Sequence, residues 1–185
     1  MQMKKGSIIG LGNVLKGDFG IGCYILEALG HGLLGDCVEL AYLGDDPRGA
    51  AGLIYGMDLV IVVSALCLGG PAGRVYIWPY RVFNQHLSWI VGKEPVILRL
   101  VQELATVELA GGFPKEILFI WIEPRIIEGL GMSSQVRRAV WKVVAIIKEK
   151  LVAKRLLQRE ALQVCPFLRV EAVAAGTLES RKVGI

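Results

Sequence analysis

Carboxylates and a histidine stand at several points of this 185-residue chain where an α/β fold could bring them to one site. Asp18 follows a glycine-rich stretch near the N-terminus, Asp45 and Asp46 form an adjacent pair, and His86 lies near the middle of the chain. Carboxylate oxygens and imidazole nitrogens together suit a divalent first-row metal ion. A metal site rebuilt from these four residues is therefore one hypothesis that the sequence raises.

Each of these residues also has a structural interpretation, which we favour from the sequence alone. Asp18 stands where a helical pattern opens, and an acid in the first turn favours the helix dipole. Asp45 and Asp46 belong to a Gly-Asp-Asp-Pro turn, in which aspartates are common for local hydrogen bonding. His86 is the kind of isolated histidine that most often packs in a core or faces solvent.

Other catalytic or binding motifs are incomplete. Gly10-Leu-Gly12 begins a dinucleotide fingerprint, but Leu15 takes the third glycine position, which would compromise close packing of helix on strand. No Walker lysine motif follows. Cys67 has no evident histidine partner, and Ser64 lacks the turn that presents a nucleophilic serine. Nucleotide binding stays as an alternative, and a cysteine or serine nucleophile is disfavoured.

The elements that must position these residues alternate between short apolar runs and helical patterns, which predicts an α/β fold. Strands are expected over residues 7–11, 37–42, 59–64, 74–78 and 116–122. Helices are expected over residues 19–33, 47–55 and 95–107, and from a cap at Ser133 or Ser134 to residue 151, with a pattern that continues to residue 162. Residues 80–91 show no clear period.

These elements predict one α/β domain over residues 1–163, with a mainly parallel five-stranded sheet sandwiched between helices. Residues 164–185 are expected to form a C-terminal extension or tail. The first loop would then place Asn13 and Asp18 at the carboxyl end of a buried strand, where open α/β sheets carry their sites.

Composition narrows the class of protein. Hydrophobic residues make up 54% of the chain, which excludes disorder, and the net charge of +4 is too weak to indicate nucleic-acid binding. The longest apolar run, residues 59–68, is about half the length of a membrane span. Four widely spaced cysteines form no CxxC pair. We therefore expect a cytoplasmic protein without a membrane span.

The stretch from Gly10 to Gly22 resembles the opening motif of the [NiFe]-hydrogenase maturation endopeptidases, in which a GxGN turn is followed by two adjacent acids and a glycine. Further similar blocks follow in the family's order at residues 58–65, 70–73, 113–124 and 129–133, and the resemblance covers residues 6–151. It implies a hydrogenase-type large subunit as partner, from which the family removes a C-terminal extension. Nickel there belongs to the substrate, as a recognition element, and no cofactor of the protein's own is implied.

The chain departs from this family at the residues that meet the metal. The family uses an acid in the first loop, an aspartate that ends the third strand and a histidine before the middle helix. The first position falls on Phe19 and the second on Ser64, whereas Asp18 matches a neighbour that is not a ligand. His86 lies in the right region, but the histidine can also align with residues 92–94, Gly-Lys-Glu.

The resemblance and its departures lead to a prediction about function. We expect a degenerate member of the family that binds a [NiFe]-hydrogenase-type large subunit or another maturation or assembly partner. The alternatives are an active nickel-dependent endopeptidase and a nucleotide-binding α/β protein, so enzymatic activity and catalytic residues stay open. We expect no bound metal. The alternative is a metal ion that Asp18 and His86 bind. The candidate site rim consists of Asn13, Asp18, Phe19, Asp45, Asp46, Ser64 and His86.

Overall fold

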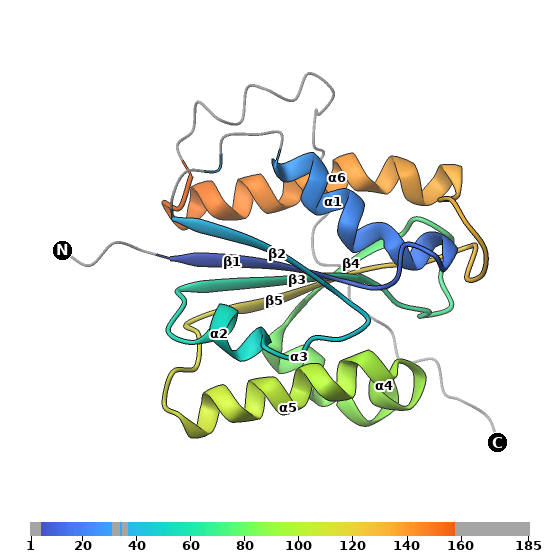
Figure 1. Ribbon diagram of the computed structural model, residues 1–185. Coiled ribbons are helices and arrows are strands. Elements are labelled where there is room, and N and C mark those ends of the chain that lie inside the picture. The colour runs from blue at the N-terminus through green and yellow to red at the C-terminus, as the bar shows by residue number, and fades with distance from the viewer. Residues whose placement is uncertain (1–4, 31–33, 35–36, 158–185) are drawn as a thin grey trace.

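Five strands form one sheet in the order β2-β1-β3-β5-β4 (Figure 1). The computed structural model describes residues 5–30, 34 and 37–157. Strand β1 pairs in parallel with β2 and β3, β3 pairs in parallel with β5, and β4 lies antiparallel on the edge beside β5. The strands are β1 Gly6–Leu11, β2 Val38–Gly44, β3 Leu59–Ala65, β4 Val75–Pro79 and β5 Ile117–Ile122. The predicted five-stranded, mainly parallel sheet is confirmed.

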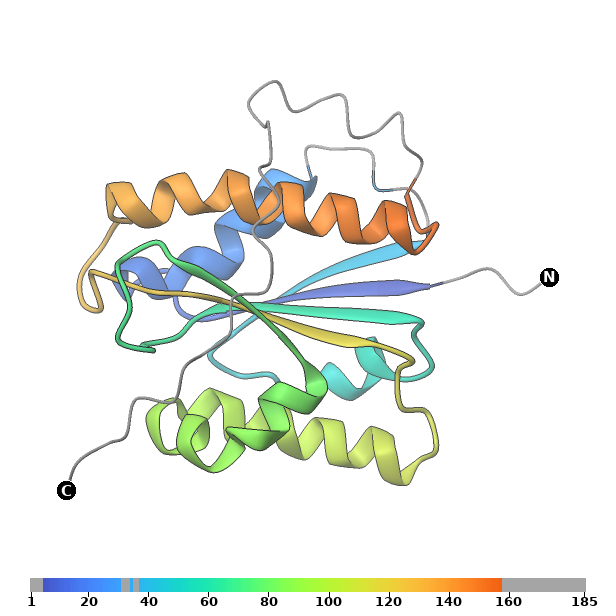
Figure 2. The ribbon, with the colours of Figure 1, turned by 180° about the vertical axis from the view of Figure 1, so that it is seen from behind.

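Helices cover both faces of this sheet. Figures 1 and 2 show α1 and α6 on one face and α2, α3, α4 and α5 on the other. The helical elements are η1 Gly17–Gly20, α1 Ile21–Gly30, α2 Ala50–Ile54, α3 Tyr80–Gln85, α4 Leu87–Lys93, α5 Pro95–Leu109 and α6 Ser134–Ala153. Within the described residues, none of the helices combines the length and the apolar character that crossing a membrane requires.

Two cores follow from this layering, one on each face of the sheet. Strands β1, β3 and β5 are buried at every position, as parallel strands covered on both faces should be. Ile8 packs toward α1 and α6, and its neighbour Ile9 packs toward the opposite helices. In that second core the ring of Phe83 stacks on Phe119 with centroids 3.9 Å apart.

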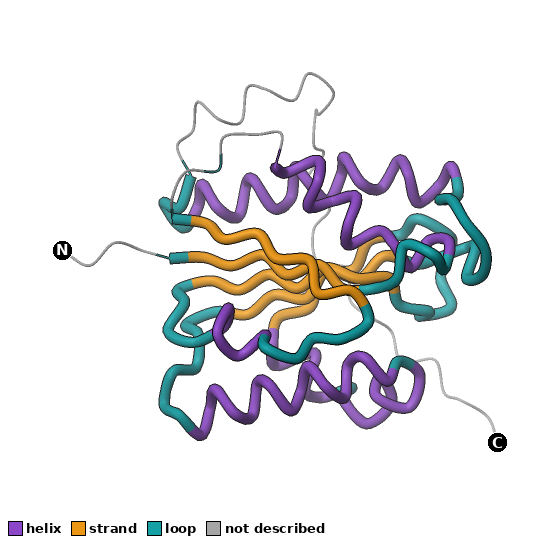
Figure 3. The backbone as a smooth tube through the Cα atoms, in the orientation of Figure 1, coloured by secondary structure: helices purple, strands orange, loops and turns teal. Residues whose placement is uncertain are grey.

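The stretch without a clear period, residues 80–91, forms the two short helices α3 and α4 (Figure 3). Each contributes one fully buried residue, Phe83 from α3 and Ile90 from α4. One anchor per helix produces no repeating apolar pattern, because a helical period becomes visible only over several turns.

Helix α6 ends close to the last residue of its apolar stripe. It begins at Ser134 with Ser133 as the cap, as expected, and ends at Ala153, two residues beyond 151, without the continuation toward residue 162. Arg155 takes a left-handed conformation with φ of 58°, and the Leu156 amide donates to the Leu151 carbonyl, a C-terminal capping arrangement. The predicted boundary at residue 163 and the tail over residues 164–185 lie outside the described residues and stay predictions.

Helix α1 packs closely on strand β1, contrary to what the missing third glycine of the fingerprint suggested. A Cβ on Gly22 would lie 2.4 Å from the Leu11 carbonyl oxygen, and a Cβ on Gly10 would lie 2.8 Å from the Gly22 carbonyl oxygen. Glycines at these two positions therefore supply the close approach. The helix begins after a short 3-10 turn, η1, rather than at residue 19, and residues 31–33 lie outside the described part.

Candidate functional site

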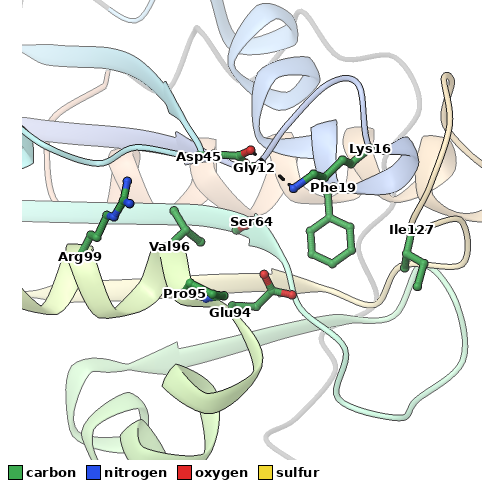
Figure 4. A pocket seen from close by; sticks show the side chains of 10 residues that line it. All are labelled: Gly12, Lys16, Phe19, Asp45, Ser64, Glu94, Pro95, Val96, Arg99 and Ile127. Carbon is green, nitrogen blue, oxygen red and sulfur yellow. Dashed lines mark ion pairs between the residues drawn. The ribbon is translucent and has the colours of Figure 1, made fainter.

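A pocket of about 450 Å³ opens at the carboxyl ends of the parallel strands (Figure 4). The chain leaves β1 toward β2 on one side and returns to β3 on the other, so this edge carries a topological switch point. Open α/β sheets bind ligands at such points. The lining residues come from loops after β1 and β2, from β3, from the start of α5 and from the loop after β5: Gly12, Lys16, Phe19, Asp45, Ser64, Glu94, Pro95, Val96, Arg99 and Ile127.

Gly12 allows the loop after β1 to fold back on itself. Its φ is 108°, and a Cβ at this position would lie 1.9 Å from the carbonyl oxygen of Phe19. Its amide donates to the Gly44 carbonyl at 2.9 Å, which joins the loops that follow β1 and β2. A side chain here would move the backbone that carries Phe19, so this glycine fixes one wall of the pocket.

Asp18, which precedes the lining residue Phe19, is fully buried. Its carboxylate accepts hydrogen bonds of 2.8 Å from the amides of Arg125 and Ile126, and bonds of 2.7 and 2.8 Å from the amide and hydroxyl of Ser133. Burial alone would raise the pKa of Asp18, but these hydrogen bonds outweigh it and leave the pKa below its ordinary value. The carboxylate therefore holds the loop after β5 in place.

Asn13 and Asp45 form one side of the pocket opening. The Asn13 Oδ1 atom accepts from the amide of Leu15 at 2.8 Å, a local turn, and its Nδ2 atom donates to Asp45 Oδ2 at 2.8 Å. The Lys16 ammonium lies 3.8 Å from the same carboxylate. These polar contacts orient Asp45 at the rim and pair its charge.

Asp46 is paired as well. Its carboxylate accepts a 2.6 Å hydrogen bond from Arg48 Nε and lies 3.5 Å from Arg99 Nη1. The Arg48 contact is the first cause that lowers the pKa of Asp46, and Arg99 contributes further. Arg99, rather than Asp46, lines the pocket.

Glu94 is the acidic residue that the start of α5 contributes to the pocket. It is half-buried at the cap position of α5, just before Pro95, and its side chain makes no capping hydrogen bond. Burial raises the pKa of Glu94; nearby Lys16 lowers it and Asp45 raises it. Figure 4 shows its carboxylate pointing into the pocket.

His86 contributes to a different part of the molecule. Its ring packs against Trp78 with centroids 5.3 Å apart, in the region of α3 and α4, rather than lining the pocket. Asp18 and His86, the alternative metal ligands, are therefore not brought together at the pocket.

The described residues hold few anionic groups that could share one metal ion at the pocket, where Asp45 and Glu94 are the carboxylates of the lining. Within the described residues, no three or more histidine, cysteine, aspartate or glutamate side chains form a group that could hold one. Phe19 presents a ring and Ser64 a neutral hydroxyl, which donates weakly to the Ala65 carbonyl at 3.3 Å. Neither supplies the anionic donors that a hard or borderline cation requires.

The structure thus brings together part of the predicted rim. Phe19, Asp45 and Ser64 line one pocket, Asn13 bonds to Asp45, and Asp46 contacts the lining residue Arg99, whereas Asp18 is buried outside the lining. The sequence analysis did not identify Lys16, Arg99 and Ile127 as lining residues, because none of them belongs to a recognisable motif. It reached Glu94 only as one of three positions that align with the family's histidine.

No model of a known protein family matches the sequence, and no curated protein matches it. Solved structures share the fold. The hydrogenase maturating endopeptidase HybD from Escherichia coli is 22% identical, with a TM-score of 0.73, over 81% of this chain and 93% of that one. The [NiFe] hydrogenase maturation protease HybD from Thermococcus kodakarensis is 22% identical, with a TM-score of 0.64, over 83% and 99%.

A third match is the hydrogenase 2 maturation peptidase from Thaumarchaeota archaeon SCGC_AB-539-E09, which is 24% identical, with a TM-score of 0.59, over 80% of this chain and 98% of that one. At these identities the likeness establishes a hydrogenase maturation protease fold for this chain.

Proposed function

We propose that this protein binds a [NiFe]-hydrogenase-type large subunit through the pocket at its sheet edge and does not cut it. The observation that carries the proposal is the pocket itself. It lies at the switch point of a hydrogenase maturation protease fold, and Phe19 and Ser64 line it. These are the two positions at which the family resemblance places anionic metal ligands.

Electrostatics supports the loss of cleavage. A dication in a protein is held chiefly by the charge of its ligands, and it requires deprotonated donors arranged around one point. An aromatic ring and a buried hydroxyl replace two carboxylates here, and Asp18 is already saturated by the loop that it holds. Nickel carried by a substrate would find too few donors in this pocket to be recognised.

Exposed apolar side chains on the two loops that contribute Lys16 and Ile127 to the pocket support a protein partner. Leu15 is 64% exposed, Ile127 53% and Leu130 80%. Their two loops lie against each other, because the Gly17 amide donates to the Gly129 carbonyl at 2.6 Å. Apolar residues gathered at a polar pocket are typical of protein interaction sites. We call Leu15, Ile126, Ile127 and Leu130 the apolar rim.

Binding to the large subunit from the same organism tests the proposal. Purified protein is titrated with that subunit, prepared with and without its C-terminal extension, in a biolayer interferometry experiment. We expect saturable binding that Leu130→Glu weakens about tenfold or more, as loss of an interface anchor does. Leu109→Glu is the matched control, because Leu109 is 90% exposed at the end of α5. The proposal is overturned if the protein binds neither form of the subunit.

A further inference from the structure

Glu94 is a charged residue of the pocket whose carboxylate has no hydrogen bond or ion pair among the described residues. Asp45 lies 3.8 Å from Lys16, and Asp46 contacts Arg48 and Arg99. Within the described part of the chain, the Glu94 carboxylate has neither a hydrogen bond nor an ion pair, although it is half-buried. Burying a carboxylate without a partner is unfavourable, and this cost is removed when a ligand supplies a cation.

The Phe19 ring points into the same pocket as this carboxylate (Figure 4). The ring is half-buried and comes from η1, whereas Glu94 comes from the start of α5, so the two groups face the pocket from different elements. The face of an aromatic ring carries negative potential and attracts cations. A carboxylate and a ring that share one pocket therefore favour the same kind of ligand.

The chemistry of the walls selects among cations. Within the described residues, no group of three or more His, Cys, Asp or Glu side chains could hold a metal ion, and an inorganic anion would meet the carboxylates of Glu94 and Asp45. An ammonium group is strongly hydrated and loses that hydration on entering a pocket with apolar walls such as Val96 and Ile127. A guanidinium group is planar, more weakly hydrated, stacks on aromatic rings and binds a carboxylate through two parallel hydrogen bonds.

We propose that this pocket is a binding site for the guanidinium group of an arginine side chain, held between the Glu94 carboxylate and the Phe19 ring. The cavity of about 450 Å³ has room for the side chain and its flanking backbone. Lys16 and Arg99 also line the cavity, and each forms an ion pair with an aspartate, Asp45 and Asp46 respectively. The inference rests on the proposed function only in assigning this arginine to the partner protein.

An NMR titration with small probes tests the inference without any partner. The ¹⁵N-labelled full-length protein is titrated with Nα-acetyl-arginine-N-methylamide and, separately, with the citrulline and lysine analogues. Citrulline keeps the shape of arginine but carries no charge. We expect saturable shifts at the amides of Phe19, Asp45 and Glu94 with the arginine probe, and about tenfold weaker binding of the citrulline analogue, the loss that a charged hydrogen bond implies.

Two substitutions locate the site. Glu94→Gln is expected to lower the affinity for the arginine probe about tenfold, and Phe19→Leu is expected to lower it severalfold. Glu108→Gln, the same change on the exposed surface of α5, leaves the affinity unchanged. The dispersed spectrum of each variant reports its folding. Equal affinity for the arginine probe and either analogue, unchanged affinity in Glu94→Gln, or no saturable binding overturns the inference.

The two proposals can fail separately. If the large subunit binds the Glu94→Gln variant as tightly as the wild-type protein, the assignment of the arginine to that subunit is refuted and the partner proposal stands. If the arginine probe binds as expected but the large subunit does not bind, the partner proposal is refuted and the guanidinium site stands.

Discussion

The hydroxyl of Ser133 donates a 2.8 Å hydrogen bond to Asp18 Oδ2, and the same hydroxyl accepts from the Val136 amide at the start of α6. One serine therefore caps helix α6 and anchors the buried carboxylate of Asp18. Asp18 also accepts from the amides of the loop after β5. Two walls of the pocket, η1 and residues 125–133, are thus fixed to each other.

The Asp18→Asn variant should be markedly less stable. In this variant an amide nitrogen replaces one carboxylate oxygen and faces backbone donors, so charged hydrogen bonds are lost. We expect the free energy of unfolding to fall by about 3 kcal/mol. Urea unfolding measures the difference. Asp45→Asn, an exposed aspartate, is the control and should change stability by less than about 0.5 kcal/mol. Equal effects of the two substitutions would contradict the anchoring role.

The contribution of Asp18 to stability should depend on pH. Hydrogen bonds keep its folded pKa below the ordinary value, so the unfolded chain binds its proton first as pH falls. The stabilisation is complete above the unfolded pKa of about 3.9 and is lost as pH falls through the lower, folded pKa. The stability difference between the wild-type protein and Asp18→Asn should be constant near neutral pH and should shrink in strong acid. A difference that grows with acidity would refute this.

Alanine should have opposite effects at two helical glycines. Gly22→Ala is expected to destabilise the protein by about 1–3 kcal/mol, since its Cβ has no room against β1 and overpacking costs that much. Gly52→Ala, in α2, meets nothing within 4 Å and should gain up to about 1 kcal/mol from helix propensity. Thermal unfolding of both variants checks the signs. A stabilising Gly22→Ala would show that α1 does not need its close approach to β1.

Much of the framework could be predicted from the sequence because buried parallel strands are nearly continuous apolar runs, as residues 59–64 illustrate. The presence of Phe19 and Ser64 in one pocket could also be predicted, because Phe19 follows one parallel strand and Ser64 lies near the end of another, at the same edge of the sheet. Glu94 could not be placed so directly, because its position depends on how two short helices, α3 and α4, return the chain to the pocket.

The four hydrogen bonds to the Asp18 carboxylate could not be predicted from the sequence pattern either. Its partners, Arg125, Ile126 and Ser133, are more than a hundred residues away, and three of its four hydrogen bonds come from backbone amides that carry no sequence signature. A first-turn acid and a buried anchor look the same in a sequence. Long-range packing decides between them.

Placing carboxylates at positions 19 and 64 should create metal binding. In the double variant Phe19→Asp with Ser64→Asp, new anions would face the pocket beside Glu94 and Asp45. We expect Cd²⁺ or Ni²⁺ to bind at least about tenfold more tightly than to the wild-type protein and to raise the melting temperature, because a ligand that binds the folded state stabilises it. Calorimetry and thermal unfolding measure both effects.

The double variant Phe19→Asn with Ser64→Asn is the control, because it matches the size of the new side chains without their charge. It should bind these ions no better than the wild-type protein. Equal binding by the charged and uncharged variants would show that the charge of these two positions does not govern metal binding in the pocket.

The intact mass of a nickel-loaded precursor large subunit, measured after incubation with this protein, tests most directly whether the pocket binds without cutting. The two proteins are mixed, separated by size exclusion and weighed by mass spectrometry. A complex that contains the large subunit at its full, unchanged mass is the predicted result. A large subunit shortened by its C-terminal extension would contradict it.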